Sequence, residues 1–361
     1  MRVLHLVDVH SSCSGPILHQ AVRSCIDSMP EHDHVVLEVG GGERDTVLGD
    51  RAVVRIPPLL KVRPLTGSAH PLAQFLKAQS AHVDLVQSWG QASTSLSATC
   101  CGGLRRVAML DAFSLTPAFA RELRVASDMV LGCTVHGSAR RLIDSGVTAT
   151  RVHHLPPVVQ WPVADDRAAW RDRWGACDDT IVLGVFDEPR GTAGLRQVAH
   201  VVSRLGLLGE RLRLVVSPES ARIEDTHRWL TVLGFPDTVV EDDAVDRAWN
   251  VIDAIDVVVV GGGRDVEIAG SAGLCLARAA GRSILLGSGH PAAEEERDSE
   301  DVFVDCDRNE DKASAWARSR WRTVDPVTDA TPLADGLREL YRVFDAGITP
   351  ASASQASGAV S

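Results

Sequence analysis

The residues best suited to chemistry lie in one stretch of the sequence, from Asp253 to Gly289. A β-branched run, Val257 to Val260, is typical of a buried strand, and three consecutive glycines follow it. A helix rich in small residues is then predicted from Ala272 to Ala280. Three backbone N–H groups at the predicted start of this helix would face a phosphate: Ala272, Gly273 and Leu274. The pattern indicates a βαβ unit that binds a nucleotide.

Other catalytic and metal-binding patterns are missing from the sequence. It has neither the G-x-S-x-G pattern of serine hydrolases nor a P-loop. His153 and His154 are adjacent on a predicted strand, so they point to opposite faces and cannot chelate one metal ion together. The eight cysteines include no C-x-x-C pair and no Cys/His cluster at zinc spacing. We therefore expect no metal site, and thiols that stay reduced and mostly buried.

The composition is that of an ordinary globular protein. The 361 residues are 45% hydrophobic, and no apolar run approaches the roughly 20 residues of a membrane span. The first residues, MRVLHLVDVH, predict a strand rather than a signal peptide, because His5 and Asp8 interrupt the apolar run. A net charge of −11 argues against nucleic acid as a partner. We expect a cytoplasmic protein without a transmembrane segment, and peripheral membrane contact is compatible with this.

Strands and helices alternate along two parts of the chain, which predicts two domains. Residues 1–157 and residues 158–330 each show apolar strand runs separated by helical patterns. Such alternation is typical of a parallel sheet with helices on both faces. Pro156-Pro157 marks the boundary, since residues before proline avoid the helical region. We predict an α/β protein of two Rossmann-like doubly wound domains facing a cleft, a closing helix over 331–346 and a disordered tail over 347–361.

Four segments carry a family resemblance through their order and spacing. They are DLVQSWG (84–90), RVHHLPPVVQ (151–160), GVFDEPRG (184–191) and the run from Asp256 onward. In these segments the chain resembles the family-4-type glycosyltransferases, which are retaining enzymes of the GT-B architecture. The resemblance implies transfer of a sugar from a nucleotide-sugar donor to an acceptor hydroxyl with retention of configuration. It also implies a metal-independent reaction without a cofactor, and a closing helix that packs back on the first domain.

The resemblance assigns donor-binding roles in both domains. Gly184 opens the second-domain motif, and Arg190 falls on the family's lysine, where it would place a cation on the diphosphate leaving group. Val185 stands where the family has a companion arginine, so one phosphate cation is lost. Gly15, in the loop after the first strand, is the one glycine kept from the family's glycine-rich loop.

One carboxylate remains at the family's paired-glutamate motif. Alignment on Gly281 places Leu276 at the second glutamate, and Leu276 cannot accept hydrogen bonds from a ribose. The same alignment places Ile268 at the first glutamate. A slip of one residue in the loop restores Glu267 to that first role, next to the donor sugar. We predict Glu267 as the catalytic residue.

The acceptor side of the motif is also altered. Gln87 and Trp89 stand where the family has histidines, and we predict that both line the acceptor side. Gln87 can still donate and accept a hydrogen bond, whereas Trp89 would stack or pack. The predicted partners are a nucleotide sugar and a glycan or lipid-linked acceptor. Because the second glutamate and the histidines are absent, an alternative stays open: a non-catalytic GT-B protein that binds a sugar nucleotide, a glycan or a partner subunit. A GT-B epimerase would need acidic and histidine residues that the sequence does not place.

Overall fold

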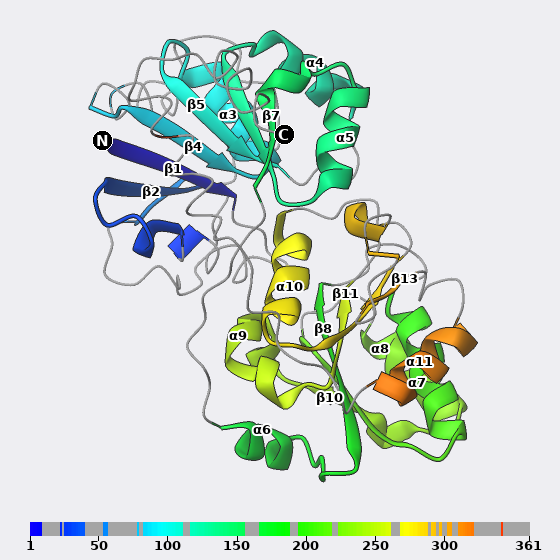
Figure 1. Cartoon of the computed structure of the whole chain (residues 1–361). Helices are drawn as coiled ribbons and strands as arrows, with labels where there is room; N and C mark the ends of the chain where they lie inside the picture. The colour runs from blue at the N-terminus through cyan, green and yellow to red at the C-terminus, as the bar shows by residue number, and fades with distance from the viewer. Residues whose placement is uncertain are drawn as a thin grey trace, which may run out of the picture. The chain divides into compact units, whose positions relative to one another are not determined.

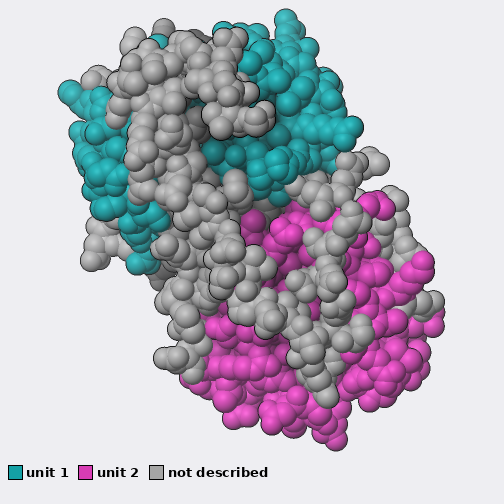
Figure 2. Space-filling model, in the orientation of Figure 1, with its two compact units in different colours: residues 1–11, 19–157, 331–361 teal, residues 12–18, 158–330 magenta. Residues whose placement is uncertain are grey.

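The computed structural model describes residues 1–8, 22–23, 25–39, 53–56, 78, 82–110, 116–155, 166–187, 194–218, 223–260, 268–287, 290–293, 296–297, 302–304, 310–320 and 341. The chain forms two compact units (Figures 1 and 2). Unit 1 comprises residues 1–11, 19–157 and 331–361, and unit 2 comprises residues 12–18 and 158–330. The predicted disordered tail, 347–361, lies outside the described residues.

Unit 1 is built on a parallel sheet. Its strands are β1 (Arg2–Asp8), β2 (Asp33–Val39), β3 (Val53–Ile56), β4 (Leu85–Trp89), β5 (Arg105–Met109), β6 (Met129–Cys133) and β7 (Val152–His154). They lie in the order β3-β2-β1-β4-β5-β6-β7. The helices of this unit within the described residues include α3 (Gln91–Cys100), α4 (Pro117–Val125), α5 (His136–Asp144) and the 3-10 turn η2 (Ala149–Arg151). All pairings between these strands are parallel.

Unit 2 repeats this plan with a second parallel sheet. Its strands are β8 (Thr180–Asp187), β9 (Arg211–Val216), β10 (Val239–Glu241), β11 (Val257–Val260), β12 (Ser283–Leu286) and β13 (Val302–Val304), in the order β10-β9-β8-β11-β12-β13. Its α-helices are α6 (Arg167–Arg173), α7 (Gly194–Leu207), α8 (Ile223–Val232), α9 (Ala248–Val251), α10 (Ile268–Ala279) and α11 (Glu310–Arg320). Short 3-10 turns η3 (Pro236–Thr238), η4 (Asp243–Arg247), η5 (Ile252–Ala254) and η6 (Pro291–Ala293) join them.

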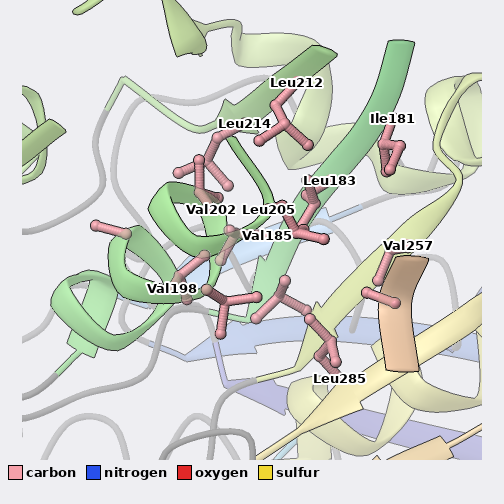
Figure 3. Packing of buried hydrophobic residues seen from close by; sticks show 14 of the residues in the cluster. Ile181, Leu183, Val185, Val198, Val202, Leu205, Leu212, Leu214, Val257 and Leu285 are labelled. Carbon is pink, nitrogen blue, oxygen red and sulfur yellow. The ribbon is translucent and has the colours of Figure 1, made fainter. Parts of the chain in front are cut away.

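The core of unit 2 explains why its helices lie where they do. Val198, Val202 and Leu205 of α7 recur at helical spacing and form one apolar stripe. The stripe packs on alternate residues of the central strands, among them Leu183 and Leu214 (Figure 3). Residues of α8 and α11 join the same cluster, whereas α10 lies on the other face of the sheet (Figure 1). Helices on both faces make the sheet doubly wound, so the predicted fold class is confirmed.

In both units a buried arginine lies at the amino ends of the strands and is hydrogen-bonded there. In unit 2, Arg171 donates to the carboxylate of Asp256 at 2.9 Å and to the carbonyl of Thr180, the first residue of β8, at 2.6 Å. In unit 1, Arg106 donates to the carbonyl of Ser97 near the end of α3, and it pairs with Asp128 just before β6. A buried charge is tolerated because each guanidinium is paired and hydrogen-bonded. These cations therefore serve the fold at the edge away from the strands' carboxyl ends.

Within the described residues, no helix combines the length and apolar character needed to cross a membrane.

Candidate functional site

Each sheet has one point where the order of its strands reverses. In unit 2 this point lies between β8 and β11, and in unit 1 it lies between β1 and β4. Open α/β sheets bind ligands outside the carboxyl ends of the strands at such switch points. The two switch points are therefore the candidate sites.

The switch point of unit 2 contains a β-bulge. Val259 pairs with Val185, but the next residue, Val260, pairs with Asp187, so Phe186 is the extra residue of β8. Bulges bend a strand and re-aim its end, and they are frequent beside functional sites. The chain continues from these strand ends into residues 188–193 and 261–267. The bulge therefore lies directly before both of these segments.

Two predicted site residues belong to these two segments of the sequence. Arg190 and Glu267 both lie outside the described residues, and so does Gly15. Asp187 and Val260 are backbone partners at adjacent strand ends. Arg190 is three residues from one of these partners along the chain, and Glu267 is seven residues from the other. Their donor-binding and catalytic roles stay predictions.

The helix after β11 begins earlier than the sequence predicts. α10 starts at Ile268, four residues before the predicted start at Ala272. Only the first four N–H groups of an α-helix lack a partner within the helix, and those of Ala272, Gly273 and Leu274 come later. The prediction that these three amides stand at the helix start is therefore wrong, whereas the donor-binding role predicted for them stays a prediction. Leu274 is buried, and its side chain belongs to the core.

Gly184 lies inside β8 rather than at its end. It pairs with Val258 of β11 and Val215 of β9. A Cβ atom added at Gly184 would lie 2.3 Å from Cδ1 of Ile255, a residue that is fully buried. This close approach gives Gly184 a packing role, and the donor-binding role predicted for it stays untested by this geometry.

Leu276 is fully buried on α10, at 0% exposure. The helix packs against β8, β11 and β12, and Leu276 faces this interior together with Leu274 and Ala277. A position inside the core cannot reach a ribose. Leu276 therefore packs in the core of unit 2.

The turn after β12 brings a buried histidine to the carboxyl ends of the strands. His290 is 1% exposed, and its ring Nδ1 accepts a hydrogen bond from the backbone N–H of Ala292 at 3.1 Å. The N–H of Gly287, directly after β12, donates to the carbonyl of Val260 at 3.1 Å. The sequence analysis did not identify His290. The sequence feature that marks it is a histidine-proline pair four residues after a buried strand.

In unit 1, Gln87 and Trp89 are buried side chains on one face of β4. Oε1 of Gln87 accepts a hydrogen bond from the hydroxyl of Tyr341. The ring of Tyr341 is also 5.5 Å from the ring of His32, centroid to centroid. Burial, together with the nearby Cys25, raises the pKa of Tyr341 well above its usual value of 10. Gln87 is thus hydrogen-bonded to Tyr341, a residue of the same unit that comes 254 positions later in the sequence.

Trp89 is the start of a chain of three hydrogen bonds, the first of them buried. Its indole Nε1 donates to Nδ1 of His5 at 3.2 Å, and Nε2 of His5 lies 2.9 Å from Nδ1 of His34. An indole N–H can only donate, so neutral His5 carries its proton on Nε2 and donates it to His34. Nε2 of His34 then donates to the carbonyl of Met29 at 2.9 Å. Gln87 and Trp89 are buried and hydrogen-bonded to protein groups, and the acceptor-side role predicted for them stays a prediction.

The switch point of unit 1 holds a carboxylate of its own. Asp8, the last residue of β1, accepts hydrogen bonds from the N–H groups of Ala92 at 2.8 Å and Ser93 at 2.6 Å. These are two of the unpaired N–H groups at the start of α3. Gly90 precedes the helix with a φ of 116°, and a Cβ there would meet Oδ2 of Asp8 at 2.3 Å. Asp8 therefore caps α3 in the place where an anionic ligand would otherwise bind.

Of the adjacent residues His153 and His154, the second contacts a histidine of another element. His154, at the end of β7, stacks on His136 of α5 with 3.6 Å between ring centroids. Burial, together with His136, lowers the pKa of His154. Burial also lowers the pKa of His153. In the part of the chain that the structure describes, no group of three or more His, Cys, Asp or Glu side chains could hold a metal ion.

Comparison with solved structures shows the fold. HepE from Anabaena, crystallised with UDP and glucose, superposes with a TM-score of 0.67 at 14% identity, covering 96% of this chain and 100% of that one. A glycosyltransferase from Rickettsia africae gives 0.58 at 11% identity, with coverage of 97% and 90%. A putative UDP-N-acetylglucosamine 2-epimerase from Listeria monocytogenes gives 0.63 at 12% identity, with coverage of 95% and 97%. With its two doubly wound sheets, the chain has the GT-B fold.

Sequence comparison adds no further assignment. No protein-family model matches the chain. No curated protein matches it either.

Proposed function

We propose that the protein is a glycosyltransferase that moves a sugar from a nucleotide-sugar donor to an acceptor hydroxyl, with retention of configuration and without a metal ion. The observation that supports this most is the GT-B fold shared with HepE, a protein crystallised with UDP and with UDP-glucose. The donor would bind at the switch point of unit 2, next to the bulge between β8 and β11.

The two sequence-predicted residues of that site have complementary tasks in this proposal. Arg190 would stabilise the negative charge that develops on the leaving diphosphate. Glu267 would hold or stabilise the transferred sugar. A glycan or a lipid-linked sugar would supply the acceptor hydroxyl.

Isothermal titration with UDP, ADP, GDP and UDP-glucose tests the proposal. We expect micromolar to millimolar binding of one nucleoside diphosphate, in the range usual for enzyme substrates. Arg190→Gln should weaken that binding at least tenfold. Arg228→Gln, the same change at an exposed arginine of α8, should leave it unchanged. Absence of binding to every member of this panel would rule the proposal out.

Sugar transfer is tested separately from binding. Glu267→Gln should keep nucleotide binding and lose transfer, whereas the control Glu224→Gln, at an exposed position of α8, should retain both. Full activity of Glu267→Gln would remove Glu267 from the site.

A specific observation favours a second candidate, a non-catalytic protein that binds a sugar nucleotide, a glycan or a partner. Leu276 is locked in the core, and Gln87 and Trp89 are buried and hydrogen-bonded to other residues. Leu276 thus offers no polar group where the family has a glutamate, and Oε1 of Gln87 and Nε1 of Trp89 are already hydrogen-bonded to protein groups. Binding of a nucleotide sugar without hydrolysis or transfer to any tested acceptor would support this candidate.

A further inference from the structure

We propose that His290 is a positioning residue of the donor site, an inference that rests on the proposed function of unit 2. It would hold the turn after β12 in the shape that forms one wall of the nucleotide-binding region. Three observations lead to this assignment: its place in the sheet, the attachment of the turn, and the chemistry of its ring.

The place comes from the topology. β12 lies next to β11, one of the two strands at the switch point of unit 2. Because all strands of this sheet are parallel, the residues after β12 lie at the same edge as those after β8 and β11. α10 connects β11 to β12 along the chain and packs on both, so its first turn also lies at this edge. The turn that contains His290 therefore belongs to the edge where a donor would bind.

The turn is attached at two points. At its start, Gly287 donates to the carbonyl of Val260, the last residue of β11 before the loop that leads to Glu267. At its other end, Glu296 is buried and pairs with Arg278 of α10. Between them lies the 3-10 turn η6. The described residues of this turn are thus bonded to both β11 and α10, the two elements that flank Glu267 along the chain.

His290 shapes this segment through one ring nitrogen. Nδ1 accepts from the N–H of Ala292, two residues on, which is the geometry that an asparagine side chain produces in an Asx turn. The accepting Nδ1 places the proton of the neutral ring on Nε2. The ring is 1% exposed, so it cannot act as a surface base. Its role is to fix the backbone of the turn, and asparagine is the substitution that keeps this hydrogen bond.

The test uses three variants of the full-length chain, with UDP as the probe. His290→Leu removes the acceptor, and His290→Asn keeps one at the same spacing. Thr180→Val is the matched control, because Thr180 is a buried side chain of the same unit whose hydroxyl accepts from the N–H of Cys177 at 3.0 Å, at the amino ends of the strands. Binding is measured by titration calorimetry and folding by thermal unfolding.

We expect His290→Leu to weaken UDP binding at least tenfold and His290→Asn to remain within threefold of the unmodified protein. Thr180→Val should lower the unfolding temperature and leave UDP binding unchanged. The inference is wrong if the unmodified protein binds UDP and His290→Leu binds it equally well, or if asparagine fails to restore binding. Failure of the unmodified protein to bind any of the nucleotides tested would instead overturn the proposed function, and this inference with it.

Discussion

Gly184 offers a direct test of whether packing or ligand binding explains a glycine in the central strand of unit 2. An alanine there would place Cβ 2.3 Å from Cδ1 of Ile255, 3.1 Å from its Cγ1 and 3.2 Å from its Cγ2. Contacts of 3.4 Å or more are ordinary, so the first of these is about 1 Å too short. Both residues are buried, so the side chain of Ile255 has no solvent to move into.

Two effects oppose each other in Gly184→Ala. Replacing glycine reduces the freedom of the unfolded chain and stabilises by about 0.4–1 kcal/mol where the new residue fits. Inserting a methyl group into a packed core costs about 1–3 kcal/mol. With a gap this short the packing cost dominates, and we expect a net loss of about 1–2 kcal/mol.

Ile255→Val provides the second arm, because it removes Cδ1, the atom in the worst contact. Alone it should cost about 0.5–1.5 kcal/mol. If the clash is the cause, Gly184→Ala will cost less in the valine background than in the native one, with a coupling of about 1 kcal/mol. Urea unfolding of the four proteins measures this, and titration with UDP shows whether binding changes. Additive costs in the cycle, or lost UDP binding with unchanged stability, would refute the packing explanation.

Three further predictions concern unit 1. Tyr341 is the only tyrosine of the chain, and burial raises its pKa, so the folded state holds the phenol proton more tightly than the unfolded chain does. The free energy of unfolding should therefore fall as the pH rises above 10. Phenolate absorbance should appear only together with unfolding. Asp8→Ala should lower the free energy of unfolding in urea by about 1–2 kcal/mol because α3 loses its cap. Asp8→Asn should have a stability between those of the unmodified protein and Asp8→Ala. Equal stability of these three proteins would contradict the capping role. His154 has a lowered pKa in the fold, so the unfolded chain takes up its proton first, and stability should fall as the pH drops below about 6.5. His154→Gln should flatten that dependence between pH 7.5 and 5.5, and an unchanged slope would contradict it.

The sequence predicted the fold well because strands leave strong local patterns. The run Val257–Val260 is a buried strand with the predicted bounds, and the first strand, Arg2–Asp8, lies within the run MRVLHLVDVH that predicted it. Periodicity was a poorer guide to where α10 begins. Glycine and serine at positions 270 and 271 are typical of a loop, whereas the structure continues the helix through them.

The contacts of the candidate site residues could not be predicted from local pattern. A strand residue can be placed on a face of its sheet, but the groups that cover that face come from distant parts of the chain. The partner of Gln87 is 254 residues away, and the partner of Trp89 is 84 residues away. The place of His290 near the switch point follows only once β12 is known to neighbour β11. Residue type and spacing carried no such information.

The hydrogen bond between Gln87 and Tyr341 has a consequence for how the protein is made. Domains fold as units during synthesis, with the N-terminal one usually first. Here the interior of unit 1 contains the side chain of Tyr341, which is synthesised after all of unit 2. Until that residue leaves the ribosome, the Oε1 atom of Gln87 lacks its partner and the space filled by the ring is empty. Unit 1 is therefore begun first and completed last.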